Sequence, residues 1–202
     1  MSGLQLRRWL RLGGSLSAHL QSLGARFEVQ RLSQRVDRLL PGERQSLGVR
    51  HGTRCVVREV VLRVDGRPLV FARSVAQART LNGPWRSLGG LGSQPLAQLL
   101  FDAPQVSRSV LCRLRLPGAG PWGRLLADRW RVATGHAWRE PVAWGRHSVF
   151  CKAGMALRVT EIFAPEMQAI RPPQNRRRQQ AADRLAAVDL LRPPARSAAA
   201  SR

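Results

Sequence analysis

Carboxylates are scarce in this sequence, so those inside predicted strands are the first candidates for chemistry. The 202 residues include 12 aspartates and glutamates against 34 lysines and arginines. Glu59 and Glu161 lie in segments typical of hairpin strands, and each has an arginine close by in sequence, Arg58 and Arg158. Neighbouring strand residues point to opposite faces, so Arg58 and Glu59 cannot both face one cavity. An inward Arg58 requires an anion opposite it, and the alternative is a buried or edge ion pair.

The usual signatures of cofactor and metal enzymes are missing from the sequence. It has no phosphate-binding glycine loop, dinucleotide fingerprint, G-x-S-x-G elbow or H-E-x-x-H motif. The three cysteines (Cys55, Cys112 and Cys151) are widely spaced, and the four histidines do not have the spacing of zinc ligands. We therefore expect free thiols, no metal and no cofactor.

The net charge of +22 favours anionic ligands but does not by itself indicate nucleic acid. Nearly all of the positive charge is arginine, Lys152 being the one lysine, and the arginines are scattered along the whole chain. Basic charge alone gives only nonspecific affinity for polyanions. We expect a solvated basic surface and no specific nucleic-acid partner.

The pattern of elements predicts an α+β fold. Residues 3–12 and 15–23 read as helices, and residues 26–36 as a strand. Residues 54–76 read as a hairpin of two long strands turning at Asp65-Gly66. A short helix follows Ser93, and a second hairpin turns at Ala153-Gly154. Hairpins with helices between them predict a single antiparallel sheet of about six strands with helices packed on it.

Composition divides the chain into a domain and a tail. Residues 1–165 are expected to form one domain, and residues 166–202, rich in proline, alanine and arginine, a basic disordered tail. No apolar stretch is long enough for a membrane span. The start of the chain lacks the pattern of a signal peptide, so a cytoplasmic location is expected. A monomeric protein is also expected.

Six stretches form an ordered set of motifs. They are W-L-R-L-G-G-S-L-S (9–17), R-C-V-V-R-E-V-V-L-R-V-D-G-R-P-L-V-F-A-R-S (54–74), L-N-G-P (81–84), L-G-S-Q-P-L-A-Q-L-L-F (91–101), W-G-R-H-S-V-F (144–150) and L-R-V-T-E-I-F-A-P (157–165). In order and spacing this set resembles the chorismate pyruvate-lyase family of bacterial ubiquinone biosynthesis. The resemblance implies cofactor-free elimination of pyruvate from chorismate, leaving 4-hydroxybenzoate.

The resemblance also implies roles for individual residues. Arg58 would hold the ring carboxylate with help from the backbone N–H of Leu96, and Glu161 would hydrogen-bond the ring hydroxyl at the opposite end. Arg58 and Glu161 are thus the expected catalytic residues. Leu16 would belong to the apolar wall, with an ordinary core leucine as the alternative. Arg73 is a candidate for the enolpyruvyl carboxylate, with a structural ion pair as the alternative.

The sequence departs from the family pattern in three places. The chain starts close to Trp9, so the family's leading segment is short or missing. Residues 112–141 contain an apparent insertion, which the sequence leaves open as a surface loop or a lid. Residues 171–202 have no evident counterpart in the family.

A non-catalytic binding module is the competing interpretation, because ligand-sensing domains of transcription regulators resemble the same fold. A DNA-binding segment would precede such a domain, and residues 1–8 are too few for one. An inactive relative would lack Arg58 or Glu161, and both are present.

Overall fold

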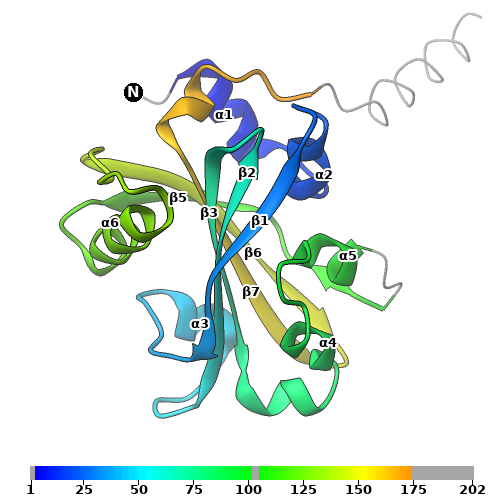
Figure 1. Ribbon diagram of the computed structural model, residues 1–202. Helices are drawn as coiled ribbons and strands as arrows, with labels where there is room; N and C mark the ends of the chain where they lie inside the picture. Colours follow the sequence, from blue (N-terminus) through cyan, green and yellow to red (C-terminus); the bar gives the residue numbers. More distant parts are fainter. Residues whose placement is uncertain (1–2, 102–104, 174–202) are drawn as a thin grey trace, which may run out of the picture. The chain divides into compact units, whose positions relative to one another are not determined.

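The computed structural model describes residues 3–101 and 105–173 (Figure 1). Its helices are α1 (Leu4–Arg11), α2 (Leu16–Gln21), α3 (Glu43–Leu47), α4 (Arg86–Gly89), α5 (Leu96–Phe101) and α6 (Pro121–Thr134), with 3-10 helices η1 (Ala78–Asn82) and η2 (Pro165–Gln168). Its strands are β1 (Phe27–Val36), β2 (Cys55–Val64), β3 (Arg67–Gln77), β4 (Ser107–Arg108), β5 (Cys112–Pro117), β6 (Val142–Lys152) and β7 (Met155–Phe163).

The strands form one antiparallel sheet in the order β1-β2-β3-β7-β6-β4, and β5 pairs with β6 beside β4. The predicted fold class is confirmed, with seven strands among the described residues where about six were expected. Strands β3 and β7, far apart in sequence, are neighbours in the centre of the sheet. This pairing joins the two hairpins that carry the candidate site residues.

Both hairpins turn where the sequence predicts. Asp65 and Gly66 connect β2 to β3 with φ angles of 49° and 76°, and Ala153 and Gly154 connect β6 to β7 with φ angles of 47° and 72°. Positive φ at both central residues is typical of two-residue turns that match the twist of the flanking strands. Asp65 Oδ1 also accepts a 2.8 Å hydrogen bond from the backbone N–H of Arg26, which ties this turn to the start of β1.

Helices cover both faces of the sheet. On one face, here the α2/α5 face, Trp9 of α1 and Leu20 of α2 share an apolar cluster with Val60, and the α5 residues share a second cluster farther along. On the other, the α3/α6 face, Trp130 clusters with Phe71. Nine of the ten residues of β2 are therefore buried, which explains why this strand shows little alternation between apolar and polar residues.

The segment 112–141 is neither a surface loop nor a lid. Its first part is the paired strand β5, and its second part is α6, where Trp122 and Trp130 are buried against the sheet. Pro121 occupies the start of α6, and Gly135 ends it in the left-handed conformation with φ 76°. Proline at the start and glycine just past the end are ordinary helix boundaries, and the glycine inside the helix, Gly123, weakens the helical pattern between them.

The compact unit continues beyond residue 165, where the sequence placed its boundary. Met167 of η2 is fully buried, and the indole N–H of Trp9 donates a 2.8 Å hydrogen bond to the carbonyl of Ile170. The unit ends at Pro172. Most of the predicted tail, from residue 174 onward, lies outside the described residues. Within the described ranges no helix is long and apolar enough to cross a membrane.

Charged side chains are buried on the α3/α6 face. Arg73 of β3 forms ion pairs with Glu43 of α3 at 2.8 Å and Glu59 of β2 at 2.5 Å, and each of the three side chains is at most 2% exposed. The other oxygen of Glu59 accepts from Arg129 of α6 at 2.6 Å and from the Ser33 hydroxyl at 2.9 Å. This network links the sheet to both helices on this face.

Replacing Glu59 with glutamine should lower the free energy of unfolding by about 3–5 kcal/mol, because it removes one of the two carboxylates that compensate the buried Arg73 and breaks its ion pair with Arg129. Urea denaturation followed by tryptophan fluorescence measures the change. Glu28→Gln is the matched control, since Glu28 pairs with Arg26 at the surface, with side chains 37% and 77% exposed. Such a pair contributes less than about 1 kcal/mol, and equal losses in the two variants would contradict the importance of the buried network.

His147 of β6 lies where a positive charge is unfavourable. It pairs in register with Thr160 of β7, and its Nδ1 atom is buried without a hydrogen-bond partner among the described residues. Burial, followed by the charge of Arg158, lowers the pKa of His147 from 6.5 to about 4. The imidazole is therefore neutral in the folded protein at neutral pH.

The free energy of unfolding should fall as the pH drops from 6.5 toward about 4, because unfolded His147 binds a proton in this window and folded His147 does not. Urea denaturation in buffers across this window measures the decline. In His147→Gln the decline should be shallower, since only groups common to both proteins still titrate. An identical pH dependence in the two proteins would rule out this contribution of His147.

Candidate active site

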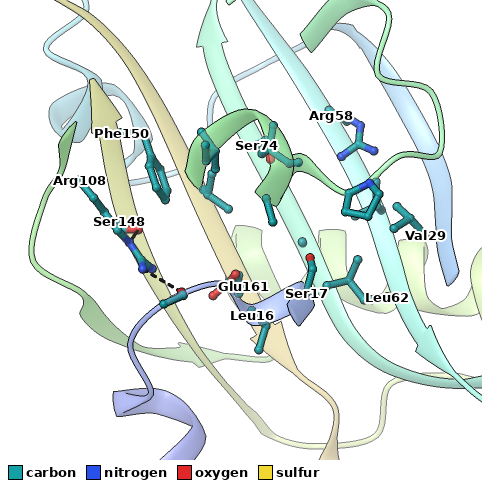
Figure 2. Close-up of a pocket in the computed structure, with 18 residues that line it drawn as sticks. Leu16, Ser17, Val29, Arg58, Leu62, Ser74, Arg108, Ser148, Phe150 and Glu161 are labelled. Atoms are coloured by element: carbon teal, nitrogen blue, oxygen red, sulfur yellow. Dashed lines mark hydrogen bonds between the residues drawn. The ribbon is translucent and has the colours of Figure 1, made fainter. Parts of the chain in front are cut away.

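A pocket lies on the α2/α5 face of the sheet, where the first residues of both helices approach the strands (Figure 2). Its strand residues are even-numbered on β2, β3 and β6 and odd-numbered on β7, as alternation requires in this register. Most of the lining is apolar. Three charged side chains reach it, namely Arg58, Arg108 and Glu161.

Arg58 of β2 is a buried cation at one side of this pocket. It is 2% exposed, and its Nη2 donates to the carbonyls of Gly92 and Gln94 at 3.0 and 2.9 Å. Its Nε is buried without a partner, and no acid of the described residues forms an ion pair with it. Burial, reinforced by the charge of Arg31, lowers its pKa to about 10, so the guanidinium remains protonated at neutral pH. Such a group is a binding site for a ligand anion.

The start of α5 lies beside Arg58. The carbonyl of Gln94 holds the guanidinium, and the next residues, Pro95 and Leu96, line the pocket. The first amides of a helix have no carbonyl partner within the helix. Leu96, the first residue of α5, and Arg58 therefore line the same pocket.

Glu161 of β7 presents a carboxylate to the pocket from the neighbouring hairpin. Its Oε2 accepts a 2.6 Å hydrogen bond from Nε of Arg146, and its side chain is 16% exposed. Arg146 is fully buried and also donates from Nη1 to the carbonyls of Trp9 and Leu12, at 2.8 and 2.6 Å. The orientation of Glu161 is thus coupled to the end of α1.

Helix α2 supplies part of the apolar wall. The Ser15 hydroxyl accepts a 3.2 Å hydrogen bond from the backbone N–H of Ala18 and so caps the helix. Leu16 follows, lining the pocket while only 3% exposed and belonging to the same apolar cluster as Val60 and Leu62. Both expectations for Leu16, a wall residue and a core leucine, describe its position.

Arg73 is not in the pocket. It lies on the α3/α6 face, in register with Glu59, while Ala72 and Ser74 on either side of it line the pocket. Its guanidinium is engaged by Glu43 and Glu59, and these acids hold the pKa of Arg73 above its usual value despite burial. Arg73 therefore does not line this pocket, and it forms the structural ion pair that was the alternative interpretation.

Arg108 of β4 is a pocket residue that the sequence did not reveal. Its Nε donates to the Ser148 hydroxyl at 2.9 Å, its Nη1 donates to the Gly14 carbonyl at 3.1 Å, and its guanidinium carbon lies 5.2 Å from the centre of the Phe150 ring. Figure 2 shows it on the side of the pocket away from Arg58. Strand β4 has only two residues, so no local pattern marked one arginine among many.

The fold and pocket together define a single-sheet α+β domain with a largely apolar pocket against one sheet face, lined by two arginines and one glutamate. A solved structure of PhnF from Mycobacterium smegmatis has the same fold, with a TM-score of 0.53 and 14% identity over 75% of this chain and 64% of that one. A GntR-family transcriptional regulator from Bacillus cereus has a TM-score of 0.50 at 8% identity, over 70% of this chain and 94% of that one.

Sequence comparison identifies the family. The family model described as chorismate lyase matches residues 1–169. A probable chorismate pyruvate-lyase of Albidiferax ferrireducens is 44% identical over 158 residues, covering 78% of this chain and 80% of that protein. One from Azoarcus sp. is 41% identical over 162 residues, covering 80% and 84%. The chain belongs to the chorismate lyase family.

Gly145 should be required where β6 pairs with β7 beside Glu161. A Cβ at Gly145 would lie 2.6 Å from the backbone oxygen of Glu161, a contact that only a backbone shift can relieve. Gly145→Ala should therefore lower the free energy of unfolding by about 1–3 kcal/mol, measured by urea denaturation. Gly90→Ala is the matched control, because an added Cβ there meets nothing within 4 Å. A Gly145→Ala protein as stable as the control would refute this close packing.

Proposed function

We propose that this protein eliminates pyruvate from chorismate to give 4-hydroxybenzoate. The observation that carries the proposal is the buried guanidinium of Arg58, which has no acidic partner among the described residues and lines an apolar pocket shared with Glu161. Membership of the chorismate lyase family and the names of the relatives support the same reaction.

The chemistry requires little from the protein beyond binding and orientation. Chorismate carries one carboxylate on its ring, and on two adjacent carbons across the ring a hydroxyl and an enolpyruvyl ether. Breaking the ether bond to the ring carbon releases enolpyruvate, and loss of the proton from the hydroxyl-bearing carbon makes the ring aromatic. Enolpyruvate takes up a proton to become pyruvate, so atoms and electrons balance without another reactant. Orientation and exclusion of water are the contributions expected of the pocket.

The pocket residues suit the two ends of the ring. Arg58 and the Leu96 N–H bind the ring carboxylate, with the charge-assisted strength of a guanidinium–carboxylate contact. Glu161 hydrogen-bonds the ring hydroxyl, and Leu16 packs against the ring. The reaction needs no metal or cofactor in this scheme, and its product 4-hydroxybenzoate is the precursor for ubiquinone synthesis.

Purified protein incubated with chorismate and EDTA should release 4-hydroxybenzoate and pyruvate in equal amounts, measured by chromatography. Arg58→Ala and Glu161→Ala should each lower kcat/KM by about 10- to 100-fold or more, the range for loss of a hydrogen bond to a charged group. Circular dichroism checks that each variant is folded.

Arg67→Ala and Glu28→Gln are the matched controls, because Arg67 is exposed, the Glu28 side chain is 37% exposed, and neither residue lines the pocket. Both variants should keep wild-type activity. A folded wild-type protein that releases neither product would overturn the proposed reaction. Binding of 4-hydroxybenzoate by that same inactive sample would indicate a ligand-binding module instead.

A further inference from the structure

The pocket contains a second arginine, Arg108, which has no role in the reaction as proposed above. Arg108 lines it from β4, far in sequence from Arg58 on β2, and Figure 2 shows the two on opposite sides of the site. Two guanidinium groups around one small apolar pocket favour a ligand that carries negative charge. Glu161 lines the same pocket, and Arg146 already binds that carboxylate.

The position of Arg108 is fixed by its surroundings. The Ser148 hydroxyl accepts from its Nε, the Gly14 carbonyl accepts from its Nη1, and the Phe150 ring lies 5.2 Å away. These partners come from β6 and from the loop that precedes α2, two other parts of the pocket wall. The guanidinium is therefore held in place before a ligand arrives, which lowers the entropic cost of binding.

Arg108 lies at the Glu161 end of the pocket. Burial lowers the pKa of Arg108, and the nearby Glu161 carboxylate is the group that most opposes this shift. In chorismate the ring hydroxyl and the enolpyruvyl ether are on adjacent carbons. A hydroxyl bound at Glu161 therefore directs the enolpyruvyl group, with its own carboxylate, to this same end.

We propose that Arg108 binds the carboxylate of the enolpyruvyl group. The inference rests on the proposed function and assigns to Arg108 the role that the sequence suggested for Arg73. After elimination the second carboxylate leaves with pyruvate, so 4-hydroxybenzoate keeps its contacts with Arg58 and has no group left to contact Arg108.

The test compares three ligands by calorimetry. They are 4-hydroxybenzoate, 3-ethoxy-4-hydroxybenzoate and 3-(carboxymethoxy)-4-hydroxybenzoate, which place nothing, a neutral ether and a carboxylate-bearing ether beside the hydroxyl. The wild-type protein should bind the dicarboxylate about 10- to 100-fold more tightly than the neutral ether. Arg108→Gln should abolish this preference while changing the affinity for 4-hydroxybenzoate less than about threefold, and Arg108→Lys should restore part of it.

Two further variants distinguish the role of Arg108 from general effects. Arg113→Gln removes the same charge from an exposed position on β5 and should leave all three affinities unchanged. Arg58→Gln should weaken all three ligands together. With chorismate, Arg108→Gln should raise KM more than it lowers kcat.

The inference fails if the wild-type protein shows no preference for the dicarboxylate, or if Arg108→Gln retains the preference. Equal weakening of all three ligands in Arg108→Gln would also overturn it, because that result indicates a purely structural role. The proposed reaction is judged separately, by chorismate turnover in the wild-type protein. A preserved ligand preference without turnover would retain the role of Arg108 in binding and reject the lyase activity.

Discussion

Two arginines on the paired strands β2 and β3 are buried to the same extent but satisfied differently. Arg73 is compensated within the protein by Glu43 and Glu59. Arg58, also 2% exposed, donates to the carbonyls of Gly92 and Gln94 and has no acidic partner among the described residues. Backbone dipoles compensate a buried cation less completely than a carboxylate does, so Arg58 retains a capacity to bind an anion. The pocket depends on this difference.

The difference arises because helices cover both faces of the sheet. On the α3/α6 face the covering helices bring Glu43 and Arg129 to the strands, where both join the ion-pair network of Arg73 and Glu59. Arg158 on the same face donates to the Gly42 carbonyl and the Ser46 hydroxyl of the α3 region. On the α2/α5 face the covering helices bring apolar side chains and a helix start. One face therefore holds the ion-pair network, and the other holds the pocket. The network fixes the strands from which the pocket residues project.

The pocket is also connected to the ends of the chain's first helices. Arg146 joins Glu161 to the carbonyls of Trp9 and Leu12, and Arg108 contacts the carbonyl of Gly14. The segment between α1 and α2 thus contacts both arginines at the Glu161 end of the site. Its position is set in turn by the burial of Trp9, which bonds to the carbonyl of Ile170. Residues remote in sequence consequently determine where the acid and its neighbours point.

The sequence by itself determined the features that depend on adjacent residues. Asp65-Gly66 specifies its turn because aspartate and glycine tolerate positive φ, whereas at Ala153-Gly154 only the glycine adopts it readily. The two turns define the two hairpins. The sequence also gave the relative orientation of Arg58 and Glu59, since strand neighbours alternate. The ordered motifs pointed to Arg58 and Glu161, and the structure places both side chains in one pocket.

Only the tertiary structure decided which face of the sheet, the α2/α5 face or the α3/α6 face, each strand residue points to. Strands covered on both faces lack a polar side, so alternation could not show that Arg73 faces Glu43, thirty positions away in sequence. Arg108 reaches the pocket through the pairing of a two-residue strand with β6, a long-range contact without a local signature. The place of α6 against the sheet depends likewise on burial of its tryptophans by residues distant in the chain.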